Sequence, residues 1–196
     1  LSRMGWLFLL LVLAIGALVG CGGASEGEAD ATGLTVTVSI VPQQYFVERI
    51  GGEHVTANVM VTPGASPATY EPKPEQLKAL SRSAAYFSIG VPFENAWLER
   101  IADANPEMVM VDTIADIERV PLAAHTHGED EDHAHDDAHD EDKDDHEHEA
   151  GSPDPHVWLS PELVKVQART IADALIALDS EHEAAYEENL AAFVAD

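Results

Sequence analysis

The run LTVTVSIVPQQYFVERIGGEHVTANVMV, residues 34–61, decides the fold. Its first part, 34–41, is rich in β-branched side chains, which predicts a strand. A short helix is predicted over 43–50, and the pair Gly51-Gly52 is placed to end it. Residues 55–61 predict a second strand. A strand, a helix and another strand in this order are typical of a parallel βαβ unit.

The same alternation continues along the chain. Two more helices are predicted over 74–83 and 94–104, and two more strands over 85–89 and 108–111. This order predicts an α/β fold with a parallel four-stranded sheet and helices on both of its faces. Ligands of such folds bind outside the carboxyl ends of the strands. Here those ends are the loops after Val41, Val61, Ile89 and Val111.

The last part of the chain predicts two further helices. Ser160 and Pro161 suit the N-cap and the first position of the first one. The polar pair Asp179-Ser180 interrupts the apolar pattern, and Ser180 with Glu183 predicts a capping box for the second helix. The chain stops inside that helix, so we expect the sequence to be truncated. The apolar residues expected to face inward are Leu163, Val166, Ile171, Leu175, Leu178, Tyr186, Leu190 and Phe193.

An acidic, histidine-rich loop is predicted over 121–155. Its centre, HTHGEDEDHAHDDAHDEDKDDHEHEAG, carries 13 Asp or Glu residues and a single Lys, and almost nothing apolar to bury. Ordering it would cost backbone entropy without a compensating core, so we expect it to be disordered in the absence of metal. It holds seven of the ten histidines in the chain: His125, His127, His133, His135, His139, His146 and His148.

Two interpretations of this loop remain open. An acidic run is often only a solvated linker. Acidity alone does not require histidine, however, and neutral imidazoles among carboxylates are suitable ligands for a divalent transition metal. We therefore favour metal capture at several weak sites, because a disordered segment must be organised before it can coordinate an ion.

The N-terminus predicts export and lipidation. Residues 1–20 combine Arg3 with an apolar run that is too short for a comfortable membrane span and suits a signal peptide. The run ends in Leu-Val-Gly-Cys21, which resembles a bacterial lipobox; the alternative is an uncleaved anchor helix with a chance cysteine. Residues 21–33 would then form a flexible tether to the membrane. If Cys21, the only cysteine, is lipidated, no thiol remains for disulfides, zinc binding or catalysis.

The net charge of −26 argues against nucleic acid as a partner, because phosphates would be repelled. About half of that charge comes from the histidine-rich loop, where 13 acids and one Lys leave −12. The rest of the chain is still acidic, which favours attraction of cations.

Three motifs follow strands or the histidine-rich loop. They are PGASPATYEPKP at 63–74, IGVPFENAW at 89–97 and DPHVWLSP at 154–161. Together with the lipobox they resemble the zinc/manganese group of ABC-transporter substrate-binding lipoproteins, the ZnuA-like family of solute-binding proteins. The resemblance covers residues 34–196.

This resemblance implies a division of the chain. Residues 34–120 would form an α/β lobe, completed after the loop by a metal-motif loop and helix at 156–180. Residues 181–196 would begin a long helix leading to a second lobe, with the metal held between the lobes. Such a protein catalyses nothing. It delivers zinc, or alternatively manganese, to a permease and its ATPase from the outer side of the membrane.

The resemblance also assigns the principal metal ligand to His156. A neutral imidazole in a loop stiffened by neighbouring proline and tryptophan suits zinc. The family usually places another histidine where this chain has Ala68. Glu71 could replace it, a loop histidine could reach in, or a second lobe could supply most ligands; these alternatives stay open.

Several other conspicuous residues are expected to have ordinary roles. Trp97 and Trp158 are predicted to be packing residues, and Glu94 is predicted to be structural. His54 and His182 are predicted to be ordinary surface residues.

Two other function classes compete with transport. An extracytoplasmic zinc buffer or chaperone would bind ions through the loop without a permease. A metallohydrolase would need a compact motif such as H-E-x-x-H, and the sequence His146-Glu147-His148 lacks that spacing.

Overall fold

The protein forms the predicted four-stranded parallel sheet. The structure, a computed structural model, describes residues 33–122 and 152–196. All strand pairs are parallel, and the spatial order is β2-β1-β3-β4. The point at which the strand order reverses therefore lies between the neighbouring strands β1 and β3. The expected α/β class is therefore confirmed. The strands are β1 (Leu34–Val38), β2 (Val55–Val59), β3 (Ala85–Ser88) and β4 (Val109–Asp112).

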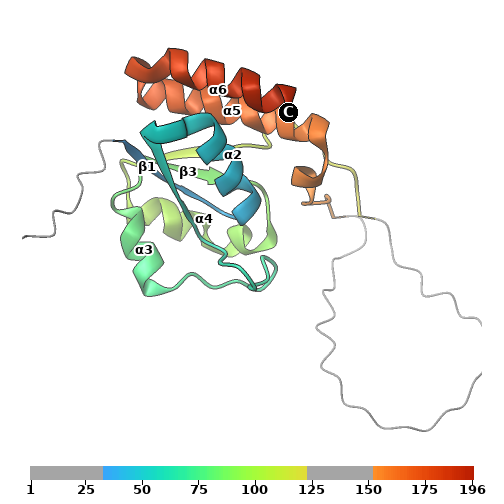
Figure 1. Cartoon of the computed structure of the whole chain (residues 1–196). Coiled ribbons are helices and arrows are strands. Elements are labelled where there is room, and N and C mark those ends of the chain that lie inside the picture. Colours follow the sequence, from blue (N-terminus) through green and yellow to red (C-terminus); the bar gives the residue numbers. More distant parts are fainter. Residues whose placement is uncertain (1–32, 123–151) are drawn as a thin grey trace, which may run out of the picture. The chain divides into compact units, whose positions relative to one another are not determined.

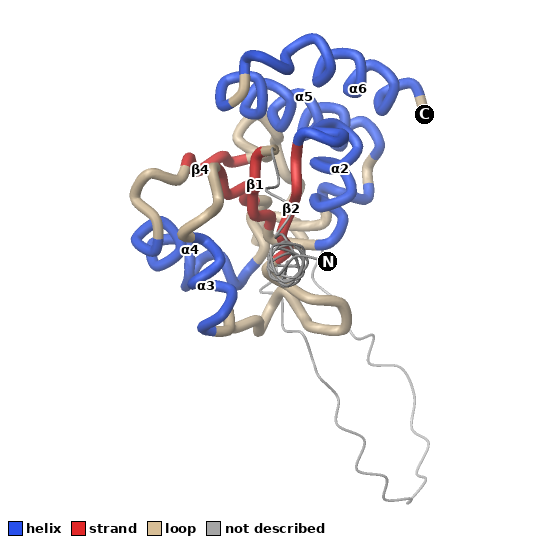
Figure 2. The backbone as a smooth tube through the Cα atoms, turned by 60° about the vertical axis from the view of Figure 1, so that its left-hand side comes forward, coloured by secondary structure: helices blue, strands red, loops and turns tan. Residues whose placement is uncertain are grey.

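Helices cover both faces of this sheet (Figures 1 and 2). One face carries α2 (Val41–Gly51), α5 (Pro161–Leu178) and α6 (Glu183–Ala195), and the other carries α3 (Pro74–Leu80) and α4 (Pro92–Ala104). Within the described ranges, short 3-10 turns occur at η1 (Gly52–His54), η2 (Val157–Leu159) and η3 (Ser180–His182).

Two hydrophobic clusters form the core, one on each face. The central strand β3 is buried along its whole length, and its alternating side chains divide between the clusters. Phe87 packs with α2, α5 and α6, whereas Tyr86 points to the α3 and α4 side. Helix α5 is long enough to pack along the sheet because Ala168, Ile171 and Leu175 form a fully buried stripe. The predicted inward-facing residues Tyr186 and Leu190 are likewise buried.

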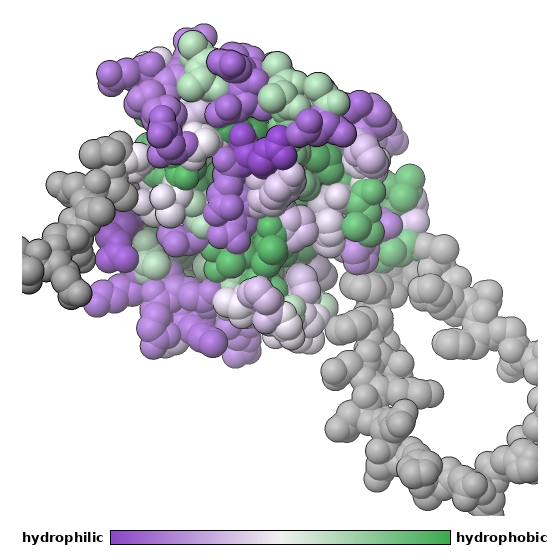
Figure 3. Space-filling model, in the orientation of Figure 1, coloured by the Kyte–Doolittle hydropathy of each residue, from purple (hydrophilic) through white to green (hydrophobic). Residues whose placement is uncertain are grey.

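Polar side chains predominate over the helices on one face of the protein (Figure 3). On the face shown in Figure 3, hydrophilic side chains cover most of α5, α6 and the region of α3. Among the described residues, none of the helices combines the length and apolar character needed to cross a bilayer.

The element boundaries differ slightly from those predicted. Strand β1 ends at Val38 instead of residue 41, and α2 begins at Val41 with proline in its first turn. The reason lies in a side chain of that helix: Oε1 of Gln43 accepts a hydrogen bond from the backbone N of Ser39, at 3.1 Å. This contact ends the strand and starts the helix early, which the β-branched run could not reveal.

The predicted capping box at Ser180 and Glu183 is wrong. Ser180 lies in η3, and α6 begins at Glu183 without a side-chain cap. The polar contacts at this corner are instead made by Asp179, whose Oδ2 accepts hydrogen bonds from His182 Nδ1 and Tyr186 Oη, both at 2.7 Å. Ser160 does precede α5, with proline next, but its hydroxyl makes no capping bond.

Candidate metal centre

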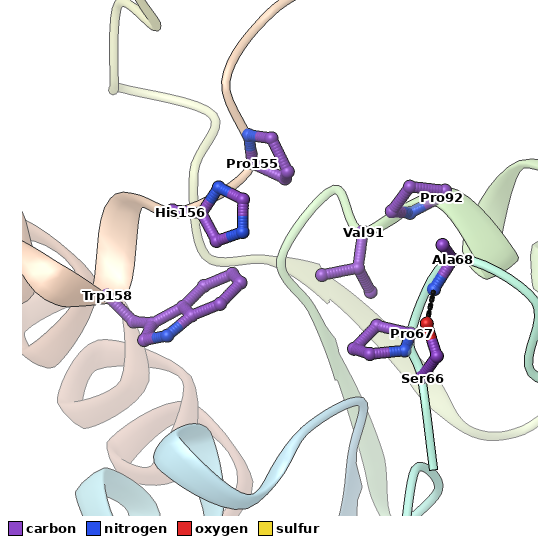
Figure 4. A pocket seen from close by; sticks show the side chains of 8 residues that line it. All are labelled: Ser66, Pro67, Ala68, Val91, Pro92, Pro155, His156 and Trp158. Atoms are coloured by element: carbon purple, nitrogen blue, oxygen red, sulfur yellow. Dashed lines mark hydrogen bonds between the residues drawn. The ribbon is translucent and has the colours of Figure 1, made fainter. Parts of the chain in front are cut away.

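The expected cavity lies at the carboxyl ends of the strands. It has a volume of about 200 Å³ and is bounded by the loop after β2, the loop after β3 and the segment that precedes α5 (Figure 4). An adjoining hollow is lined by the loop after β1 and shares Pro67 and Trp158 with this cavity. The cavity therefore forms where sheet topology predicts a binding site. It is lined by Ser66, Pro67, Ala68, Val91, Pro92, Pro155, His156 and Trp158.

The loop after β3 is held in place by Glu94. The carboxylate of Glu94 accepts hydrogen bonds from the backbone N atoms of Ile89 and Gly90, at 3.0 and 2.7 Å. Gly90 has a φ of 74°, a left-handed conformation in which glycine is favoured. The next turn is tied to the opposite wall, because the backbone N of Phe93 donates to the carbonyl O of Pro67 at 3.0 Å. These bonds hold the loop after β3 against the loop after β2.

Glu94 is a buried acid. The residue is only 2% exposed, and its carboxylate also accepts a hydrogen bond from the hydroxyl of Ser39. Burial raises the pKa of Glu94, and the hydrogen bonds from Ser39 and the two backbone N atoms oppose that rise. The prediction that Glu94 is structural agrees with these contacts.

His156 enters the cavity from the segment before α5. Oδ1 of Asp154 accepts hydrogen bonds from the backbone N of His156 at 2.9 Å and from its Nδ1 at 2.7 Å. The ring lies against Trp158, with centroids 5.1 Å apart and planes tilted by 55°. A ring that donates from Nδ1 carries its lone pair on Nε2, and this is the pairing that metal-bound histidines commonly use.

A short antiparallel neck leads into this motif. Pro121 and Pro153 form an antiparallel β-bridge. It is flanked by hydrogen bonds from Leu122 N to Ser152 O and from Asp154 N to Val120 O, both at 2.8 Å. The two ends of the histidine-rich loop are thus held together directly before Asp154. The seven loop histidines and Cys21 lie outside the described residues.

The structure brings together only part of the predicted site. His156 and Ala68 both line the cavity, and Trp158 packs beside them and against both core clusters. Glu71 is exposed and is not among the lining residues. Within residues 33–122 and 152–196, no three His, Cys, Asp or Glu side chains are grouped so as to hold a metal ion. The described residues therefore offer one imidazole, His156, as a ligand at the cavity.

Sequence reasoning missed two features. Asp154 belongs to the DPHVWLSP motif, but its role as the acid that orients His156 was not predicted; its place two residues before a ligand histidine could have indicated it. His54 and His182 are not ordinary surface residues, because both are half-buried and their rings stack with centroids 3.7 Å apart. They lie far apart in sequence, so no local pattern indicated that contact.

The known proteins that this chain matches include metal ABC transporter substrate-binding lipoproteins. The metal ABC transporter substrate-binding lipoprotein SsaB of Streptococcus sanguinis is 31% identical over 99% of this chain and 57% of its own length. The manganese ABC transporter substrate-binding lipoprotein PsaA of Streptococcus anginosus is 29% identical, over 97% of this chain and 56% of its own length.

Solved structures agree with this. A ZnuA deletion mutant lacking residues 138–173 in its own numbering, solved with zinc bound, has a TM-score of 0.68 and 42% identity, covering 83% of this chain and 54% of that one. The ZnuA structure itself gives a TM-score of 0.67, also at 42% identity, covering 83% of this chain and 55% of that one.

The chain spans little more than half the length of the curated relatives it matches. The family model of the periplasmic zinc-uptake complex component A, ZnuA, matches residues 36–196, which is most of the chain. The motifs at the carboxyl ends of the strands, the parallel sheet and this match agree, and the chain belongs to the ZnuA family.

Proposed function

We propose that this protein is the metal-binding subunit of a zinc-type ABC uptake transporter, acting on the outer side of the membrane. It binds its metal as cargo and catalyses no reaction. The observation that carries the proposal is the cavity at the carboxyl ends of the strands, where Asp154 orients the imidazole of His156. A ligand histidine with a carboxylate on its other nitrogen is a typical zinc-binding pair.

Zinc is the proposed substrate, with manganese as the alternative. The ligand that this lobe presents is an imidazole, and seven more imidazoles lie in the loop. Nitrogen donors suit zinc, whereas manganese prefers carboxylate, carbonyl and water oxygens. The relatives include proteins named for either metal, so the names alone do not decide between the two.

The histidine-rich loop is proposed to collect zinc at several weak sites. Its described ends meet in the neck beside Asp154, so both attachment points of the loop lie close to His156. A zinc buffer that works without a permease uses the same loop and is the second candidate, favoured by the density of imidazoles. Adjacent genes for a permease and an ATPase would support transport, and their absence would support buffering.

The remaining assignments follow the family pattern. We propose that 34–120 and 156–180 form one lobe, and that 181–196 begins the helix leading to a second lobe. A permease with its ATPase is the proposed partner, and the net charge of −26 disfavours nucleic acid. Closure of two lobes around the ion would present a different surface to the permease.

Membrane anchoring is proposed to depend on Cys21. Cleavage after residue 20 and acylation of this cysteine would leave 21–33 as a tether. Mass spectrometry of the protein extracted from membranes tests this directly. A diacylglyceryl group on an N-terminal Cys21 is expected, and an unmodified thiol or cleavage at another site would refute the assignment.

The metal site is tested by His156→Ala. In a chain from which 123–151 has been deleted and the neck rejoined, this substitution is expected to abolish specific zinc binding in calorimetry. His54→Gln is the matched control, because it removes an imidazole that does not line the cavity. Unchanged zinc affinity in the His156 variant would show that another residue holds the metal.

A further inference from the structure

A second cluster of titratable side chains lies away from the cavity. His54, at the end of η1, and His182, at the end of η3, stack with ring centroids 3.7 Å apart and planes 19° from parallel. The rings of Tyr186 and His54 form an edge-to-face pair with centroids 6.2 Å apart. The cluster lies at the C-terminal end of α5, and the 18 residues of that helix separate it from His156 by about 27 Å of helix.

One carboxylate serves this cluster. Oδ2 of Asp179 accepts hydrogen bonds from Tyr186 Oη and His182 Nδ1, both at 2.7 Å. The tyrosine bond is the main cause that lowers the pKa of Asp179, followed by the bond from His182, so Asp179 stays ionised in mild acid. Tyr186 is fully buried, which fixes the position of this acid.

The cluster fastens the start of α6 to the turn between α2 and β2. Asn189, one turn further along α6, donates from Nδ2 to the carbonyl O of Ile50 at 3.0 Å. At the far end of the helix, Arg49 and Asp196 form an exposed ion pair, which contributes little in water. The N-terminal half of α6 is held by the buried side chains of Tyr186 and Leu190, and by the ion pair of Glu187 with Arg169 of α5. The stacked imidazoles and Asn189 add the contacts that join it to the turn between α2 and β2.

Asp179 is the carboxylate placed to compensate a positive charge in this stack. A proton on His182 forms an ion pair with Asp179. A further proton on His54 would place two positively charged rings 3.7 Å apart. The carboxylate of Asp179 can balance the charge of one of them. Their repulsion is strong at this distance, because both rings are half-buried and water screens them incompletely. The neighbouring acids Glu53, Glu181 and Glu183 are exposed, so their charges are well screened.

We propose that His54 and His182 form a pH-sensitive clasp, which holds α6 on the lobe at neutral pH and loosens it when both imidazoles are protonated. Histidine side chains ordinarily change charge between about pH 5 and 8, which sets the two pH values of the test. The clasp is independent of the proposed metal site, since none of its residues lines the cavity.

The test compares the full-length protein with His54→Phe, which keeps a ring in the stack and removes the charge. Thermal unfolding is followed at pH 7.5 and pH 5.0 in the presence of EDTA, so that metal binding does not contribute. Between pH 7.5 and pH 5.0, we expect the Tm of the wild type to fall by at least about 3 °C more than the Tm of His54→Phe. His148→Gln, which removes a loop histidine, should leave the Tm of the wild type unchanged at both pH values.

Hydrogen exchange of α6 provides the second readout. Protection of the amides at 183–190, corrected for intrinsic rates, should fall more in the wild type than in His54→Phe between pH 7.5 and 5.0. If His54→Phe does not fold at pH 7.5, His54→Gln replaces it in both measurements. A Tm difference that is the same at both pH values, with equal loss of α6 protection in both proteins, would overturn the proposal.

Discussion

Asp154 accepts two hydrogen bonds from His156 on the same oxygen, from the backbone N at 2.9 Å and from ring Nδ1 at 2.7 Å. The first bond fixes the turn that carries the histidine, and the second fixes the rotation and tautomer of the ring. The backbone N of Asp154 in turn donates to Val120, so the orientation of His156 depends on the neck.

Asp154→Ala is expected to lower zinc affinity about 10–100-fold, the usual effect of losing the carboxylate behind a metal-bound histidine. Asp154→Asn should have a smaller effect, because its amide oxygen still accepts both bonds without the charge. Competition with a zinc-binding dye, in the chain lacking 123–151, measures both. Asp173→Asn, an exposed acid on α5, is the control. The ring ¹⁵N shifts of His156 in metal-free protein should also show a loss of the Nδ1-protonated tautomer in Asp154→Ala.

Ala68→His should tighten zinc binding. Ala68 lines the cavity across from His156 (Figure 4), and a second imidazole there would raise the number of protein ligands toward the three or four that zinc prefers. Calorimetry in the chain lacking 123–151 gives the affinity. Glu71→His provides the comparison, since it adds an imidazole to the same loop at an exposed position outside the cavity. Equal gains from the two substitutions would contradict the cavity as the zinc site.

Gly90→Ala should destabilise the fold more than Gly64→Ala. Both glycines have positive φ, 74° and 85°, so both substitutions carry a backbone cost of about 1–2 kcal/mol. At Gly90 the new methyl group would also come within 2.6 Å of the Cδ1 atom of Ile114, whereas at Gly64 it meets open space. Chemical denaturation should therefore give a larger loss of unfolding free energy at Gly90. Equal losses would argue against the close packing of Ile114 on this loop.

Glu94→Gln should change how stability depends on pH. The pKa of Glu94 is raised in the folded protein, chiefly by burial, so its ionised form is disfavoured there. The stabilisation associated with this acid is present at low pH and is lost as pH rises through the raised pKa. As the pH is raised from about 4 to about 8, the Tm of the variant should therefore rise relative to the Tm of the wild type. Glu99→Gln, on the exposed side of α4, should show no such trend.

Deletion of 123–151 should reduce the number of zinc ions bound per chain while leaving a site that depends on His156. Binding by the loop should fade below about pH 6, because protonated imidazole cannot coordinate a metal. Titration calorimetry at pH 7.5 and 5.5 measures both effects. The same stoichiometry in the full and shortened chains would show that the loop is only a linker.

The order of strands and helices was predictable because short stretches of sequence determine where each element begins and ends. The β-branched run at 34–38, the glycines that end α2 and the prolines that start α3 and α5 each act over a few residues. The cavity also followed, since parallel topology places loops after β2 and β3 on the same edge. The compact motif at 154–161 also pointed to His156, which lines this cavity; its role as a metal ligand stays a prediction.

What escaped prediction depends on contacts between distant residues. The early end of β1 is set by a glutamine side chain within α2, and the corner before α6 by an aspartate instead of the expected serine. The stack of His54 on His182 joins two turns that no periodicity connects. The sequence predicted a structural role for Glu94 but not its contacts, because the three groups that donate hydrogen bonds to it come from the ends of two different strands.

The neck formed by Pro121 and Pro153 makes the histidine-rich insertion modular. Both ends of the insertion are held by this bridge and its two flanking hydrogen bonds, so residues added or removed between them need not displace Asp154 or His156. The entropy of closing a loop rises slowly with its length, by about 0.6 kcal/mol for each doubling. Evolution can therefore lengthen, shorten or recompose this insertion without redesigning the cavity that carries His156.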